Sequence, residues 1–146
     1  MTIPPGNSMN DLDWLAGNRF KELIRYEYTW TLAFDDSVSV TIGCLWRLIE
    51  NGRIRLTSRD DGHKFGLPSP VDVVLELNRM LAGANCSSAV LHEGTLDLEI
   101  RFDTGHAIQL VTDSSGYEAW AVNEPGRQFI AVGGGNLTVF CSTSDS

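Results

Sequence analysis

The sequence predicts an α+β domain that consists mostly of antiparallel sheet with one central helix packed on it. Segments of alternating apolar and polar residues outnumber helical segments and are joined by short links, which is typical of antiparallel pairing. In addition, one four-residue pattern occurs twice with the same spacing: Trp46, Glu50, Gly52 and Arg53, then Trp120, Glu124, Gly126 and Arg127. We interpret this recurrence as two pseudo-repeated β-meanders.

The first meander is predicted from alternation and turn chemistry. A short helix over 8–16 and a strand over 19–26 precede it. Alternating residues then predict strands over 28–34 and 38–42, with Asp35 and Asp36 in the turn. Asn51-Gly52 favours a type I′ turn, because both positions tolerate a positive φ. It predicts a hairpin between strands over 46–50 and 53–57.

The helix is predicted over 70–82. Ser69 is a suitable N-cap, Pro70 fits the first helical position, and Gly83 ends the helix. Apolar residues recur at helical spacing, so one face is expected to cover a sheet. After the helix, the same reasoning predicts strands over 87–92, 95–102, 106–111, 118–122, 127–132 and 137–140.

Composition predicts one soluble domain over 1–146, with flexible ends at 1–7 and 142–146. The formal charge of −8 opposes an approach to phosphate backbones, so nucleic acid is not an expected partner. No apolar run is long enough for a membrane span, and no secretory signal is recognised, so we expect a cytoplasmic protein. The three cysteines lack metal or disulfide spacing, and reduced thiols are expected.

The densest ionisable cluster lies in the loop over 59–64. Asp60, Asp61 and His63 have the residue types of a metal site, or of a base oriented by a carboxylate. A metal needs three or four converging ligands, and no second cluster completes such a set. We therefore predict no metal and no cofactor, and we interpret the loop as a solvated turn that is available for binding.

A second candidate segment surrounds the second repeated tryptophan. Strict alternation places Glu118 on the same face as Trp120, where a carboxylate needs a cationic partner. Arg47, next to Trp46, is the expected partner, so we interpret Trp46, Arg47 and Trp120 as structural residues. A ligand pocket that includes Tyr117 and Glu118 is the alternative.

Four segments in consistent order carry a resemblance: Cys44-Leu45-Trp46-Arg47, the stretch over 65–72, Asp97-Leu98, and Ser115-Gly116-Tyr117-Glu118-Ala119-Trp120. Together they resemble a family of small bacterial domains of unknown function. The likeness covers about 30–135. Relatives in that family often have Asp directly followed by His in the loop, whereas Gly62 separates Asp61 from His63 here. The resemblance implies no activity and no catalytic residue.

Two functions are compatible with these features. The first is a non-enzymatic protein-binding module, similar in its profile to immunity proteins that neutralise toxins, with a basic partner and contacts at Asp60, Asp61, Tyr117 and Glu118. The second is a small-ligand binder or hydrolase-like enzyme in which the 58–66 loop and the 113–120 segment meet, with His63 as the base. Homodimerisation through a sheet edge is a further prediction.

Overall fold

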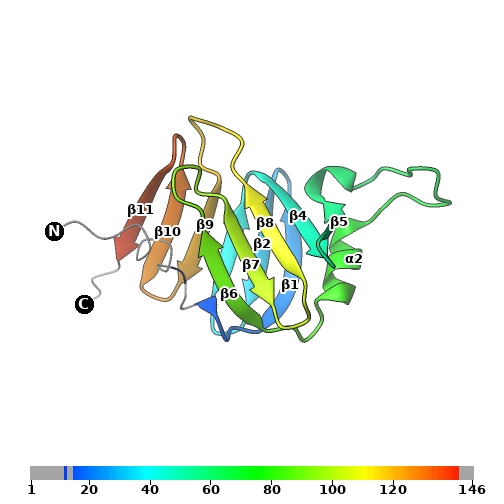
Figure 1. Ribbon diagram of the computed structural model, residues 1–146, viewed down its shortest axis with the longest axis horizontal. Helices are drawn as coiled ribbons and strands as arrows, with labels where there is room; N and C mark the ends of the chain where they lie inside the picture. Colours follow the sequence, from blue (N-terminus) through cyan, green and yellow to red (C-terminus); the bar gives the residue numbers. More distant parts are fainter. Residues whose placement is uncertain (1–11, 13–14, 142–146) are drawn as a thin grey trace.

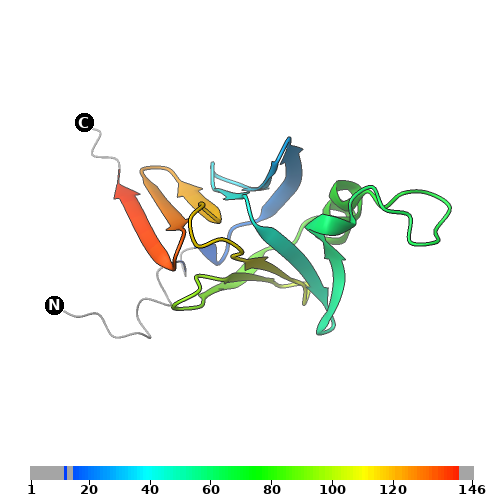
Figure 2. The ribbon, with the colours of Figure 1, turned by 90° about the horizontal axis from the view of Figure 1, so that it is seen from above.

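The computed structural model describes residues 12 and 15–141, which form two antiparallel sheets packed face to face (Figures 1 and 2). The first sheet has six strands, in the order β1 (Phe20–Tyr26), β2 (Thr29–Phe34), β3 (Ser39–Ile42), β9 (Trp120–Glu124), β10 (Arg127–Val132) and β11 (Asn136–Cys141). The second has five, in the order β5 (Arg53–Thr57), β4 (Leu45–Glu50), β8 (Ala107–Val111), β7 (Leu98–Phe102) and β6 (Cys86–Leu91). The α+β, mostly antiparallel prediction is confirmed.

Each predicted meander is divided between the two sheets. The chain changes sheet between β3 and β4, and changes back between β8 and β9. As a result β9 pairs with β3, and β4 pairs with β8. The two contacts have equivalent registers, with Trp120 opposite Ile42 and Trp46 opposite Leu110. The halves of the chain therefore exchange their second hairpins instead of forming separate sheets.

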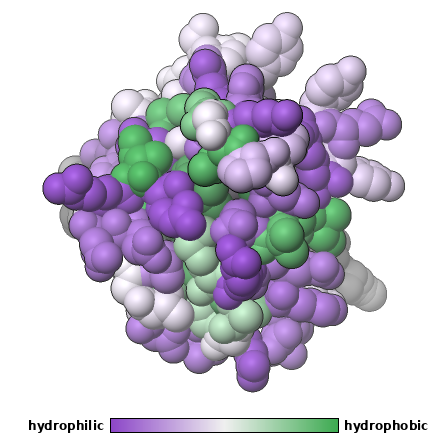
Figure 3. Space-filling view, turned by 90° about the vertical axis from the view of Figure 1, so that its right-hand side faces the viewer, coloured by the Kyte–Doolittle hydropathy of each residue, from purple (hydrophilic) through white to green (hydrophobic). Residues whose placement is uncertain are grey.

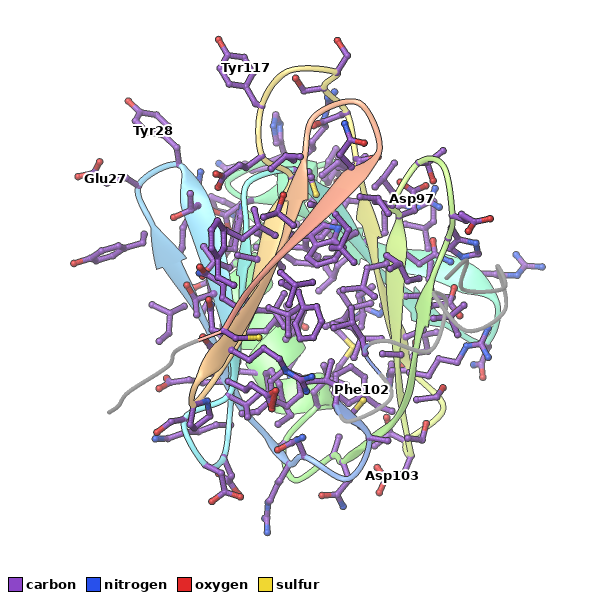
Figure 4. The ribbon with its side chains drawn as sticks, turned by 90° about the vertical axis from the view of Figure 1, so that its left-hand side faces the viewer. Glu27, Tyr28, Asp97, Phe102, Asp103 and Tyr117 are labelled. Carbon is purple, nitrogen blue, oxygen red and sulfur yellow. The ribbon has the colours of Figure 1, made fainter. Side chains whose placement is uncertain are left out.

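The core lies between the sheets and contains the inward-facing residues of both. Trp46 and Trp120 are each 1% exposed, and the Trp46 ring meets the Trp30 ring edge-on at a centroid distance of 5.3 Å. Trp120 Nε1 donates a 2.9 Å hydrogen bond to the Leu96 carbonyl oxygen. Phe102, labelled in Figure 4, packs against two other core phenylalanines. Trp46 belongs to the five-stranded sheet and Trp120 to the six-stranded sheet, so each sheet contributes one of these tryptophans to the core.

Helix α2 (Val73–Met80) is shorter than predicted, and Asp72, not Ser69, is its N-cap. Asp72 Oδ1 accepts a 3.1 Å bond from Leu75 N. The stretch before it is extended because backbone bonds fix it: Gly62 N donates to the Val71 carbonyl oxygen, and Val71 N donates to the His63 carbonyl oxygen, both over 2.8 Å. The 61–71 loop therefore closes on itself before the helix begins.

The helix covers one end of the sandwich, next to β1 and β5 (Figure 1). Val73 and Leu77 are its fully buried residues. Asn78 fixes it to the edge strand β1, because its side chain accepts a 2.6 Å bond from Leu23 N and donates a 3.2 Å bond to the Leu23 carbonyl oxygen. The helix is therefore docked by apolar burial together with a two-bond amide contact.

Strand boundaries differ from the predictions mainly at two places. β7 begins at Leu98 and not at Thr95, because Leu96 has a φ of 62° and belongs to the turn after β6. β9 begins at Trp120 and not at Glu118. The predicted helix over 8–16 lies almost entirely outside the described residues, as do the ends expected to be flexible. No helix among residues 12 and 15–141 is long and apolar enough to cross a membrane.

Candidate functional site

The carboxylates of Asp60 and Asp61 stabilise the backbone of the 58–73 region. Asp60 ends a 3-10 turn, η2 (Ser58–Asp60), and its Oδ2 accepts a 2.9 Å bond from Thr57 N. Asp61 Oδ2 forms a 2.6 Å ion pair with Arg25 Nη1, and Oδ1 accepts a 3.1 Å bond from Val73 N. Both residues are half-buried. They are less exposed than expected of contact residues, because Thr57 N, Val73 N and Arg25 occupy three of their four carboxylate oxygens.

His63 is exposed on the same loop, and its ring stacks on Phe65 at a centroid distance of 5.5 Å. The neighbouring carboxylates bind other groups: Asp60 accepts from Thr57 N, and Asp61 accepts from Val73 N and pairs with Arg25. The sequence-predicted arrangement of a base oriented by a carboxylate is therefore not formed. Within the described part of the chain, His, Cys, Asp and Glu side chains form no group of three that could hold a metal.

A groove of about 620 Å³ lies between the 61–71 loop, β5 and α2. We call it the apolar groove, and its apolar residues are Leu56, Phe65, Leu67, Pro68, Pro70, Val71 and Leu75. Phe65, Leu67 and Leu75 remain 67%, 54% and 59% exposed. Figure 3 views this end of the molecule and shows hydrophobic patches bordered by hydrophilic residues. Large apolar side chains that gather on one surface in this way are typical of an interaction site.

The polar residues of the apolar groove are mainly acidic. Asp60, Asp72 and Glu76 line it together with one guanidinium group, that of Arg55. Arg55 Nη2 lies 3.9 Å from Glu76 Oε1, and the same carboxylate oxygen accepts a 2.5 Å bond from Arg79. Asp72 uses Oδ1 to cap α2 and is exposed. Arg55 and Arg79 balance Glu76, so Asp60 and Asp72 are the lining carboxylates that favour a positively charged occupant.

Tyr117 and Glu118 lie in the 112–119 connection between β8 and β9, away from the 61–71 loop (Figures 1 and 2). Glu118 lines a small pocket of about 120 Å³ together with Thr29, which follows the β1–β2 turn. In Figure 4 the side chains of Tyr28 and Tyr117 both project from this end of the molecule. The 58–66 and 113–120 segments therefore do not form the shared pocket that the ligand-binding hypothesis requires.

Arg47 does not pair with Glu118. Its Nη2 donates a 2.6 Å bond to Gln109 Oε1, and Gln109 Nε2 donates a 2.9 Å bond to Glu99 Oε1. Glu118 is exposed, whereas Ala119 and Trp120 are both buried. Two consecutive buried residues break strand alternation, and this is why extending the pattern back to Glu118 put its side chain on the wrong face.

The polar network of Arg47, Gln109 and Glu99 crosses three adjacent strands on the outer face of the five-stranded sheet. Partial burial tends to raise the pKa of Glu99, but bonds from Arg101 and Gln109 outweigh it and hold the pKa below its ordinary value. Arg47 Nε is buried without a hydrogen-bond partner among the described residues. Both carboxylate oxygens of Glu99 are hydrogen-bonded, one by Arg101 and one by Gln109.

A family model described as a family of unknown function (DUF6188) matches residues 12–141. The chain belongs to this family. Neither the curated proteins nor the solved structures include a match to the chain. The recognition of an uncharacterised family from the sequence is therefore confirmed, and the DUF6188 assignment carries no activity, ligand or partner to this chain.

Sequence reasoning missed the apolar groove, because it interprets the loop over 59–64 as a solvated turn. The available signal was Phe65-Gly66-Leu67-Pro68, two large apolar residues among turn formers. It also missed the aromatic character of the β1–β2 turn, where Tyr26 and Tyr28 are 77% and 90% exposed. Together with Tyr117, at 82%, all three tyrosines of this DUF6188 member face solvent.

Proposed function

We propose that this protein is a non-enzymatic protein-binding module and that its partner binds in the apolar groove. The observation that carries the proposal is the set of three large apolar side chains, Phe65, Leu67 and Leu75, that line one groove and are each more than half exposed. Burying a side chain of this size contributes about 1.5–3 kcal/mol. Such anchors typically supply much of the free energy of a protein–protein contact.

The groove is also pre-organised. Asp60 accepts a bond from Thr57 N in the turn before the 61–71 loop, and Asp61 accepts one from Val73 N just after the loop. Gly62, His63 and Val71 close the loop by backbone bonds. A partner therefore meets a wall that is already ordered, which reduces the conformational entropy lost on binding. This is the role that we assign to the Asp60–Asp61 pair.

The chemistry of the groove favours a basic partner with apolar anchors. Asp72 and Glu76 stand at its border, and the whole chain carries a formal charge of −8. Acidic surfaces accelerate the association of positively charged proteins and fix their orientation. An immunity-like role in a bacterial cytoplasm, the occlusion of a basic toxin, agrees with these features and is the specific form of the function that we propose.

The surface around Tyr117 is a second candidate for partner contact. It combines Tyr28 and Tyr117 with the carboxylates of Glu27 and Glu118, all of them exposed. Tyrosine contributes a large contact area and a hydroxyl group, and it is enriched where proteins bind one another. A single variant, Tyr117→Ala, separates a contribution of this surface from that of the groove.

The test is affinity capture from an extract of the native host, followed by calorimetry with the captured protein. We expect Phe65→Ser combined with Leu67→Ser to weaken binding at least about 100-fold, because two anchors are lost. Ile24→Ser is the matched control, since Ile24 is 41% exposed on β1 and lies outside the groove. Equal capture by the groove variant and the control would refute the proposed site.

A further inference from the structure

Strand β11 is an open sheet edge without charge. Among residues 12 and 15–141 it pairs only with β10, and its six residues are Asn136, Leu137, Thr138, Val139, Phe140 and Cys141. Val139 and Phe140 are 45% and 55% exposed. An edge strand presents unpaired N–H and C=O groups, and natural proteins usually protect such an edge with charges, bulges or a covering segment. β11 carries neither a charge nor a bulge.

The other three edges are protected in these ways. β1 carries Lys21, Glu22 and Arg25 and has a register shift near its start. β5 carries two arginines and borders α2 and the 61–71 loop. β6 is uncharged, but it has a register shift after Cys86, and Cys86 N and O already bond the backbone of residues 17–18. Of the four sheet edges in the described part of the chain, β11 alone combines an uncharged sequence with a regular, unbroken register.

Both faces of β11 have an apolar side chain that is incompletely covered. Val139 lies opposite Phe129, which is buried, so Val139 points to the inner face of the six-stranded sheet. Phe140 is opposite Gln128 on the outer face. Figure 2 shows β11 at the outer end of its sheet, beyond the strands of the five-stranded sheet. The inner face of β11 therefore extends past the five-stranded sheet, and Val139 on that face is 45% exposed.

We propose that β11 pairs antiparallel with β11 of a second copy of this chain, so that the two six-stranded sheets join across a twofold axis. In such a contact the strand pairs with its own copy, and β11 brings no charge to either side of the axis. A chain with a formal charge of −8 can therefore associate with itself most readily through an uncharged edge. Pairing would satisfy the open backbone groups and bring a second strand beside Val139 and Phe140.

Sedimentation equilibrium over protein concentrations from roughly 10 µM to roughly 1 mM tests the proposal. We expect the mass to rise from 16.1 kDa toward twice that value. Val139→Lys and Phe140→Lys place like charges on either side of the axis, and each should raise the dimer dissociation constant at least tenfold. Because they change opposite faces of β11, a folding defect in one leaves the other informative. Ile54→Lys, at a 56% exposed position of β5, is the matched control.

A covalent test locates the axis. In a Cys141→Ser background, single cysteines are placed at each position over 137–140, and mild oxidation should join two chains through the position nearest the axis. A mass that stays at 16.1 kDa throughout the range would overturn the proposal, as would a dimer that neither lysine variant weakens. This test uses the purified chain alone, so its outcome is independent of the partner proposed for the groove.

Discussion

Arg25 and Asp61 form an ion pair, 2.6 Å from Nη1 to Oδ2, that joins the edge strand β1 to the beginning of the 61–71 loop. The second oxygen of the same carboxylate accepts the Val73 N–H at the first turn of α2. One side chain thus connects a strand, a loop and a helix. The position of the groove wall depends on this three-way contact.

Replacing Asp61 with alanine should lower the free energy of unfolding by about 1–3 kcal/mol, because it leaves a helix N–H without its acceptor. The ion pair adds little, since Arg25 is 46% exposed. Urea denaturation measures the change. Glu22→Ala, an exposed carboxylate on β1, is the control and should stay within about 0.5 kcal/mol of the parent.

The β10–β11 turn should tolerate no side chain at Gly135. Gly126 and Gly135 have nearly the same φ, 86° and 85°, but a Cβ at Gly135 would collide with the Gly94 carbonyl oxygen, whereas a Cβ at Gly126 meets nothing within 4 Å. Gly126→Ala should therefore cost only about 1–2 kcal/mol of backbone strain. Gly135→Ala should cost at least about 1 kcal/mol more, through displacement of the turn. If the two variants lose equal stability in thermal unfolding, the turn can move away from the added Cβ without a cost.

Acid should remove stability that Asp103 supplies. Asn85 lowers the pKa of Asp103 below its ordinary value of 3.8, because its backbone N–H donates to Oδ1 over 3.0 Å and its side-chain amide to Oδ2 over 3.2 Å. A carboxyl whose pKa is lower in the folded state stabilises the fold above the unfolded pKa. That contribution is lost as the pH falls through the folded value.

Asp103→Asn should accordingly make the fall in unfolding free energy shallower as the pH drops below about 4. Asn85→Ala, which removes one of the two donors, should have a smaller effect of the same sign. Urea titrations of the three proteins at each pH measure these slopes. If all three slopes coincide, the Asn85–Asp103 contact makes no contribution to the acid sensitivity.

The cysteines should differ sharply in reactivity. Burial, with smaller effects from nearby carboxylates, raises the pKa of Cys44 to about 12, and burial raises that of Cys86 to about 11. Cys141 is exposed at the end of β11. Because the thiolate is the reactive form, a thiol reagent near neutral pH should label one cysteine of the folded chain and all three after unfolding. Rapid labelling of Cys44 in the folded protein would contradict this assignment.

Only part of the candidate site was accessible to sequence reasoning. The 58–66 loop and the 113–120 segment were both recognised as unusual, and the loop borders the groove. Their roles depended on contacts with residues distant in the chain: Asp61 with Arg25, and Arg47 with Gln109. Spacing along the chain does not encode such contacts, and a shift of one residue at Glu118 was enough to reverse the expected face.

The sequence by itself determined the antiparallel class, most strands, the Asn51-Gly52 hairpin and the spacing shared by Trp46 and Trp120, because alternation and turn chemistry are local properties. The tertiary structure decided that each meander crosses between two sheets, that Asp72 starts the helix, and that Phe65 and Leu67 line a groove. These features arise when a sheet buries its apolar face against segments far away in the chain. Which segments meet is decided by the packing of the whole molecule.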